Sequence, residues 1–272
     1  MSSVRDKVAV VTGAGSGIGR ALALLLAARG ARLAVSDIDE AGLKGTVSLL
    51  PGEVHAATLD VGDRAAVEGY ADAVVSHYGV VHQIYNNAGV SGGGQSVLDT
   101  SWEVYEKTLA VNLFGVIHGT KAFLPHLIAS GDGHVINVSS LNGFMAQPTL
   151  SAYAASKFGV RGFTEALRTE MLVGRHPVQV TVVHPGGVKT NIASATAPLT
   201  AAQAARVRVY NEKLLKMPAE QAARIILDGV EAGRPRVLVG ADAKAVDRLV
   251  RLFPRRYPVL VARYERRLFG DA

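Results

Sequence analysis

A tyrosine and a lysine four residues apart could together move a proton. Tyr153 and Lys157 stand at the start of an expected helix over Ala152–Leu172, so their side chains share one face, one turn apart. A phenol ordinarily has a pKa of about 10, and a neighbouring ammonium group favours its ionised form. Such a group could take the proton of an alcohol while hydride leaves the carbon. The pairing alone is a weak signal, because an exposed helix pair would look the same.

A serine thirteen residues before Tyr153 could hold a substrate. Ser140 follows an expected strand over His134–Ser139, and its hydroxyl could donate a hydrogen bond to a substrate oxygen, as oxyanion-stabilising groups do. A turn serine that caps a helix or bonds to its own loop is the alternative interpretation.

A glycine-rich turn predicts a site for a pyrophosphate. Gly13, Gly17 and Gly19 stand in the pattern T-G-x-x-x-G-x-G, between an apolar strand and an Ala/Leu-rich helix. Glycine lets the backbone approach a phosphate closely, and the helix N-terminus offers free N–H groups and the positive end of a dipole. The common G-x-G-x-x-G spacing fails, because Ile18 stands at its last position. A turn that only tightens the strand–helix joint is the alternative.

An acidic residue at the end of the second expected strand predicts NAD rather than NADP. Asp37 follows the glycine turn by about 20 residues, where a carboxylate accepts hydrogen bonds from the adenine ribose hydroxyls and repels a 2′-phosphate. Neither Ser16 nor Ile38 supplies a cation that could bind such a phosphate. Asp37 could instead, or in addition, cap a helix.

A parallel sheet would bring these residues together. Short apolar, β-branched runs alternate with helical stretches, which predicts a single α/β domain with a doubly wound parallel sheet of the Rossmann type and helices on both faces. The expected strands are Lys7–Thr12, Ala31–Ser36, Val54–Leu59, Val81–Asn86, His134–Ser139, Val178–Val183 and Arg236–Val239. The expected helices include Gly19–Ala28, Ala65–His77, Trp102–Ile128, Ala152–Leu172 and Ala219–Glu231. Ligands of such sheets bind outside the carboxyl ends of the strands, where polar and glycine-rich segments follow six of these runs.

Composition bounds the class of protein. The chain has 272 residues, of which 49% are apolar, enough for a sizeable core. It has no cysteine, which excludes disulfides and thiolate metal sites and fits a reducing compartment. Its histidines form no metal-binding pattern, its apolar runs are too short to span a bilayer, and residues 1–7 lack the apolar core of a signal peptide. We therefore expect a cytoplasmic protein without a metal.

The net charge of +6 is concentrated towards the C-terminus. Residues 241–272 hold eight basic and four acidic side chains, which accounts for +4 of the total. No nucleic-acid-binding module is recognisable, so we expect no nucleic-acid partner. Basic residues mixed with Leu and Phe allow weak contact with an anionic membrane, although Pro254 and Pro258 interrupt a single helix. Packing on a neighbouring subunit and a solvated basic helix are the alternatives.

Taken together, the motifs resemble the short-chain dehydrogenase/reductase family. Seven signatures occur in the family's order over residues 7 to about 240: Thr12-Gly13-x-x-x-Gly17-x-Gly19, Asp60-Val61, Asn87-Ala88-Gly89, Asn112, Ser139-Ser140, Tyr153-x-x-x-Lys157 and Pro185-Gly186. The resemblance implies that 1–240 is a Rossmann-type dehydrogenase domain with a substrate loop at 190–217. Residues 241–272 would be a basic extension, packed on or extending the same domain.

The resemblance also implies roles for individual residues. The catalytic tetrad would be Asn112, Ser140, Tyr153 and Lys157, with Asn112 holding a water that relays the proton. Thr12 would tie the fourth strand to the glycine turn. The cofactor-binding residues would be Gly13, Ser16, Gly17, Ile18, Gly19, Asp37, Asp60, Val61, Asn87, Ala88, Gly89, Tyr153, Lys157, Pro185, Gly186, Val188 and Thr190.

The substrate side is expected to be mostly apolar. It would be built from Gly92–Gln95, Leu141–Leu150 and the loop Val188–Lys216, and it would include Phe144, Met145, Leu150, Val188 and Ile192. No cluster of Arg or Lys suggests an anchor for a carboxylate, which favours a lipophilic secondary alcohol or ketone. We expect His184 to be a packing or loop residue.

The sequence thus favours an NAD-dependent oxidoreductase acting on a small molecule. The family pairs its long helices between subunits, so a homodimer or homotetramer is expected. The alternatives are a dinucleotide-binding regulator that has lost catalysis, an NADP-dependent ketoreductase, and an epimerase or dehydratase on the same scaffold.

Overall fold

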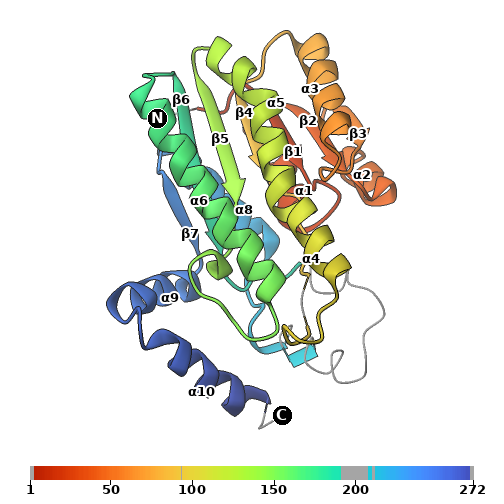
Figure 1. Cartoon of the computed structure of the whole chain (residues 1–272). Helices are drawn as coiled ribbons and strands as arrows, with labels where there is room; N and C mark the ends of the chain where they lie inside the picture. Colours follow the sequence, from red (N-terminus) through yellow and green to blue (C-terminus); the bar gives the residue numbers. More distant parts are fainter. Residues whose placement is uncertain (1–2, 93, 191–207, 210–211, 270–272) are drawn as a thin grey trace.

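The computed structural model describes residues 3–92, 94–190, 208–209 and 212–269, and it confirms the doubly wound parallel sheet (Figure 1). Its strands lie in the order β3-β2-β1-β4-β5-β6-β7, and every neighbouring pair is parallel. The order reverses between β1 and β4, which makes a switch point at their carboxyl ends. The bounds are β1 Val8–Thr12, β2 Arg32–Asp37, β3 His55–Thr58, β4 Gln83–Asn86, β5 Gly133–Val138, β6 Val178–Pro185 and β7 Arg236–Val239.

Helices cover both faces of the sheet. One face packs against α1 (Gly17–Ala28), α2 (Glu40–Val47) and α8 (Ala219–Glu231). The other packs against α3 (Arg64–Tyr78), α5 (Gly115–Ala129) and α6 (Ser151–Val173). The apolar strands feed both cores because alternate side chains point to opposite faces: Ala9 and Val11 join the first core, and Val8 and Val10 the second.

A π-helical turn interrupts the helix expected over Trp102–Ile128. The chain forms α4 (Trp102–Leu109), a π segment (Ala110–Phe114) and then α5 without leaving the helical path. Periodicity cannot reveal such a turn, since it adds a single residue to one helical turn. It places Asn112 in the interior, where the side chain is fully buried.

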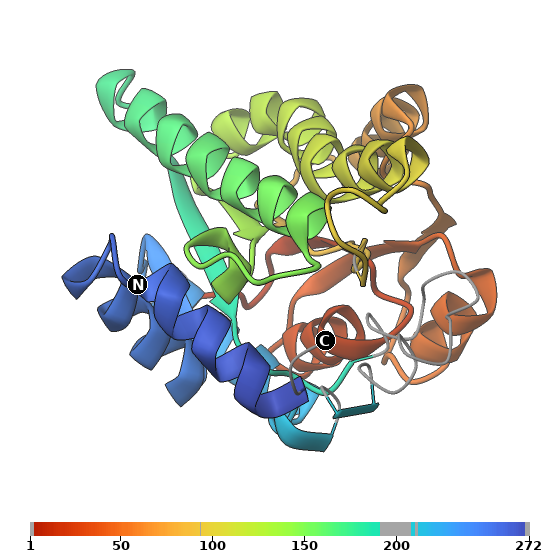
Figure 2. The same cartoon turned by 60° about the horizontal axis from the view of Figure 1, so that its bottom comes forward.

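The basic C-terminal segment folds into two helices, α9 (Ala241–Leu252) and α10 (Tyr257–Phe269). Pro254 lies between them and Pro258 in the first turn of α10, which confirms the expected interruption. Figure 1 places both helices beyond the carboxyl ends of the strands, and Figure 2, which views that edge, shows α10 running along it. None of the helices in the described part of the chain is long and apolar enough to cross a bilayer.

Candidate active site

A cavity of about 1700 Å³ opens at the carboxyl edge of the sheet, at the switch point. Pockets for one small molecule usually measure roughly 300–1,000 Å³, so this space can hold a dinucleotide together with a substrate. The cavity lining includes Ser140, Tyr153 and Lys157, and it includes every expected cofactor residue except Gly19. The sequence motifs therefore converge on one place, although they lie far apart along the chain.

The glycine turn is shaped by close backbone packing. Gly13 has a φ of +67°, and a Cβ there would lie 2.7 Å from the Ala88 Cα. Gly17 has a φ of +52°, also in the region that favours glycine. Gly19 supports the turn from behind, because a Cβ there would overlap the Gly13 carbonyl oxygen. Gly19 is thus needed for packing and does not line the cavity.

The N-terminus of α1 suits a pyrophosphate. Ser16, Gly17 and Ile18 line the cavity, and the Ser16 side chain makes no capping hydrogen bond to the helix. The first N–H groups of a helix carry a partial positive charge and need acceptors. The residues present therefore fit the phosphates of a dinucleotide.

Thr12 ties the fourth strand to the glycine turn, as expected. Its hydroxyl oxygen accepts hydrogen bonds from the backbone N–H groups of Asn87 (3.0 Å) and Ala88 (3.1 Å). The Asn87 amide returns a hydrogen bond to the Thr12 carbonyl oxygen at 3.0 Å. These contacts hold β1 and β4 together where the strand order reverses.

Asp37 stands in the wall of the cavity with its carboxylate fixed. One oxygen accepts a hydrogen bond from the Gly15 N–H at 2.7 Å, and the other from the Asp39 N–H at 2.9 Å. Asp39, rather than Asp37, is the N-cap of α2. The interpretation of Asp37 as a helix cap is therefore wrong, and its carboxylate remains beside the site expected for the adenosine ribose.

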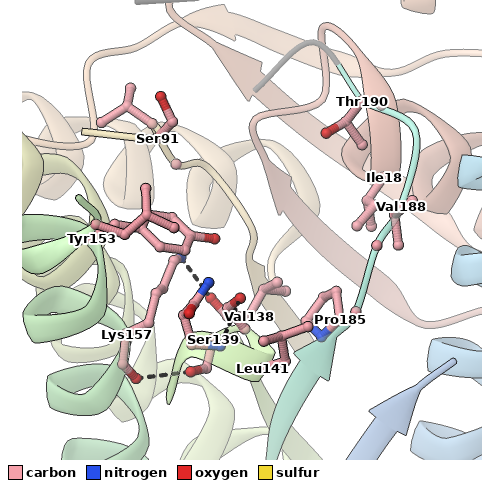
Figure 3. Close-up of a pocket in the computed structure, with 18 of the residues that line it drawn as sticks. Ile18, Ser91, Val138, Ser139, Leu141, Tyr153, Lys157, Pro185, Val188 and Thr190 are labelled. Carbon is pink, nitrogen blue, oxygen red and sulfur yellow. Dashed lines mark hydrogen bonds between the residues drawn. The ribbon is translucent and has the colours of Figure 1, made fainter. Parts of the chain in front are cut away.

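Tyr153 and Lys157 lie at the other end of the cavity (Figure 3), whose lining also includes Ser140. Tyr153 and Lys157 project from α6 on the side opposite Ile18, Val188 and Thr190. The Lys157 Nζ lies 5.7 Å from the centroid of the Tyr153 ring and donates a hydrogen bond to the Val138 carbonyl oxygen at 3.0 Å.

Burial sets the protonation of this pair. It raises the pKa of the Tyr153 phenol above its ordinary value, and the hydrogen-bonding Ser140 hydroxyl acts in the opposite direction. Burial also lowers the pKa of the Lys157 ammonium to about 8. The sequence-based expectation of a lowered phenol pKa is therefore not met by the protein alone. A cation next to the phenol would have to supply that lowering.

Asn112 does not reach the cavity with its side chain. Its Oδ1 accepts from the Val90 N–H at 2.8 Å, while its Nδ2 donates to the Val90 carbonyl oxygen at 2.9 Å and to the Ser156 hydroxyl at 3.2 Å. The side chain thus fixes the backbone after β4, and Val90 itself lines the cavity. The role of Asn112 in holding a relay water stays a prediction from the family resemblance.

His184 holds the Ser140 backbone in place through a hydrogen bond. Its Nδ1 donates to the Ser140 carbonyl oxygen at 2.7 Å, and its ring meets Phe144 edge-on at 5.0 Å. Burial lowers the pKa of His184 to about 4, so the ring is neutral near pH 7. The expectation of a packing role for His184 is confirmed.

The expected substrate side is only partly correct. Met145, Leu150 and Val188 line the cavity, whereas Phe144 is buried behind it against His184. Ile192 and most of the loop over Val188–Lys216 fall outside the described residues. Besides Lys157, three lysines border the cavity, on a side where no cluster of Arg or Lys was expected: Lys107, Lys213 and Lys216.

The sequence reasoning missed the wall made by the C-terminal helices. Val246 and Leu249 of α9 and Leu260, Val261 and Tyr264 of α10 line the same cavity as Tyr153. The spacing of the apolar residues in α10 was a visible helical signal. It did not say which surface those residues would face.

Comparison with known proteins decides the family. The sequence model described as short chain dehydrogenase matches residues 7–199. The chain belongs to the short-chain dehydrogenase family. The chain is 53% identical to SadH of Mycobacterium tuberculosis, a protein assigned by name to the oxidoreductases, over 266 residues, which cover 96% of each protein.

Solved structures agree with this assignment. A short-chain dehydrogenase/reductase from Burkholderia phymatum in complex with NAD superposes with a TM-score of 0.87 at 31% identity, covering 96% of this chain and 97% of its own. A short-chain dehydrogenase from Mycobacterium paratuberculosis bound to NAD gives a TM-score of 0.78 at 26% identity, covering 89% and 98%. This short-chain dehydrogenase is therefore an oxidoreductase with a site for a nicotinamide cofactor.

Proposed function

We propose that this enzyme transfers a hydride between NAD(H) and a secondary alcohol or ketone, with Tyr153 as the general acid–base. The observation that carries the proposal is the meeting of Ser140, Tyr153 and Lys157 in the cavity that also contains the glycine turn. When bound, NAD⁺ supplies the hydride acceptor and a positive charge. The Asp37 carboxylate, the α1 N-terminus and Thr190 would hold it along the cavity.

The side chains divide the proton chemistry between them. In the oxidative direction the Ser140 hydroxyl donates a hydrogen bond to the alcohol oxygen and orients it. The Tyr153 phenolate takes the proton from that oxygen, and in the reductive direction the phenol returns it. The charged form of Lys157, one helical turn away, stabilises the phenolate. Asn112 acts as a positioning residue through Val90.

We propose NAD as the preferred cofactor because of the charge of Asp37. Its carboxylate is fixed by Gly15 and Asp39 and cannot easily turn away from the cavity. A 2′-phosphate placed beside it would meet like charge in a partly desolvated site. An NADP-dependent ketoreductase is therefore the weaker alternative.

We propose a lipophilic substrate. Apart from the catalytic side chains Ser140, Tyr153 and Lys157, the described part of the substrate side presents mainly apolar groups. They include Met145, Leu150, Leu214 and Met217. The bordering Lys213 and Lys216 are exposed, so they can remain in water while such a substrate is bound.

A panel of secondary alcohols and ketones tests this function directly. The purified protein is assayed with NAD(H) and NADP(H), following the absorbance of the reduced nicotinamide. We expect turnover of apolar substrates with a preference for NAD(H). Turnover of only sugar-like or charged substrates would contradict the substrate class. Cofactor binding without turnover of any substrate would favour a regulator.

We propose a homodimer or homotetramer that uses the face of α4, α5 and α6. Large apolar side chains are exposed on this face, including Trp102, Phe114 and Phe158. α5 and α6 lie side by side on one side of the sheet (Figure 1). Sedimentation velocity should show a dimer or tetramer, and a monomer at micromolar concentration would refute the proposal. The cytoplasmic location stays a prediction from the sequence.

A further inference from the structure

We propose that α9 and α10 form a distal apolar subsite, which holds the hydrocarbon end of the substrate furthest from Tyr153. The inference rests on the proposed function and deepens it. It assigns a binding role to Leu249, Leu260, Val261 and Tyr264, all of which lie beyond the residues matched by the family model. The ligand class is a secondary alcohol or ketone with a long alkyl chain or an extended apolar ring system.

The cavity that contains the catalytic side chains extends to the C-terminal helices. The residues of α9 and α10 named above line the same cavity as Ser140 and Tyr153. A ligand held by Ser140 can therefore extend to the C-terminal helices inside one space. A membrane or a second protein would have to reach these residues from outside.

Apolar side chains on α10 have little protein cover. Leu260 remains 40% exposed and Tyr264 51% exposed, although both line the cavity. Covering such groups removes apolar surface from water, at roughly 25 cal/mol per Å². A lipophilic ligand in the cavity would bring this gain, whereas a short or charged ligand would leave the wall hydrated.

Hydrogen bonds fix α9 to the active site. The Asp242 carboxylate accepts a hydrogen bond from the Gly187 N–H at 2.6 Å, in the loop after β6 that lines the cavity. Arg236 of β7 donates to Asp247 at 2.6 Å, and its guanidinium stacks over Phe144 at 5.2 Å. The wall formed by α9 is thus held at a defined distance from Ser140, as a specificity pocket requires.

The positive charges of α10 lie outside the cavity. The arginines of α10 are exposed and do not line the cavity: Arg263, Arg266 and Arg267. The cavity-facing side of the helix, formed by Leu260, Val261 and Tyr264, is therefore mainly apolar and uncharged, which suits a hydrocarbon and offers no cation to a carboxylate or phosphate.

A chain-length series tests the subsite. We measure kcat/KM for 2-alkanols from 2-butanol to 2-dodecanol with NAD⁺. Each methylene that reaches the apolar wall should raise kcat/KM about threefold, somewhat less than full burial of a CH₂ group would give. A flat series in the wild-type enzyme would overturn the inference while leaving the hydride transfer intact.

A pair of variants locates the effect. Val261→Trp fills the subsite, and we expect at least a tenfold loss of kcat/KM for 2-dodecanol with less than a twofold change for 2-butanol. Val259→Trp is the matched control, because Val259 is exposed on the same helix and does not line the cavity. Equal losses in the two variants, or equal losses for both alcohols, would overturn the inference. Should Val261→Trp fail to fold, Leu249→Ala should flatten the upper end of the series.

Two further measurements separate the other occupants. If the wild-type enzyme turns over none of the alcohols, the proposed function fails. Displacement of a fluorescent apolar probe by 2-dodecanone then tests the subsite alone, and displacement that Val261→Trp weakens and Val259→Trp does not would support it. Co-sedimentation with phosphatidylglycerol vesicles tests the membrane contact predicted for the tail. Vesicle binding that Arg266→Gln/Arg267→Gln abolishes, together with a flat alcohol series, would assign α10 to the membrane.

Discussion

The cavity has a nucleotide half and a substrate half, which are formed by different kinds of groups. The nucleotide half is formed mainly by backbone groups of a glycine turn, a helix N-terminus and the ends of β1 and β4, which Thr12 joins by hydrogen bonds. The substrate half is made of side chains from β5, α6, α9 and α10, several of them only partly covered. Backbone sites tolerate few residue types and so leave motifs in the sequence, whereas an apolar wall can be made from many combinations.

The largest effect is expected where the two halves meet. Tyr153→Phe removes the group that exchanges the proton, and we expect kcat to fall by about 10³-fold. Binding of NAD⁺ should stay within about threefold of wild type, as measured by calorimetry, because the nucleotide half is untouched. A variant that retains a tenth of its activity would rule out this role for Tyr153.

The backbone half should be sensitive to one methyl group. In Gly19→Ala the new Cβ meets the Gly13 carbonyl oxygen, which is part of the turn and cannot move aside. We expect a loss of about 3 kcal/mol in the free energy of unfolding, measured by urea titration. Gly69→Ala is the control: this glycine is exposed in α3 with nothing near its Cβ, so stability should rise by about 0.5–1 kcal/mol.

The pH dependence of the free energy of unfolding tests the burial of Lys157, which lies where the two halves of the cavity meet. Burial holds the pKa of Lys157 near 8, so between pH 8 and 10 the unfolded chain binds more protons than the folded one. The cofactor-free enzyme should therefore gain stability as pH rises in this window, by roughly 2 kcal/mol relative to Lys157→Met. A difference between the two proteins that stays constant with pH would show that Lys157 is not desolvated.

The smallest expected effect concerns cofactor choice. Asp37→Ala removes the carboxylate that accepts from the ribose hydroxyls and repels a 2′-phosphate. We expect kcat/KM for NAD⁺ to fall about tenfold, as the loss of a charged hydrogen bond implies, while that for NADP⁺ rises. Asp39→Ala should lower stability by about 1 kcal/mol through loss of a helix cap, with the cofactor preference unchanged. A preference for NADP⁺ in the wild-type enzyme would refute the argument.

The same contrast explains what could be read from the sequence. We could predict the sheet, the turn around Gly13 and the pair of Tyr153 and Lys157, because each signal lies within one strand, one turn or one helix. The burial of Phe144 against His184 and the hydrogen bond that draws the Asp37 carboxylate to Gly15, leaving Asp39 to cap α2, depend on contacts between elements that are distant in sequence. The amphipathic pattern of α10 was visible, but only the tertiary structure says that its apolar side faces the cavity.

The π segment makes the length of this region matter more than its composition. The π segment holds one residue more than a regular helical turn, so deleting one residue between Ala110 and Phe114 would leave a regular α-helix in which α4 and α5 keep their alignment. The wide turn that carries Asn112 would be lost, and with it the hydrogen bonds between the Asn112 side chain and the Val90 backbone. Single-residue deletions in this stretch should lower activity and stability more than most single replacements do. The number of residues here is therefore more constrained than their identity.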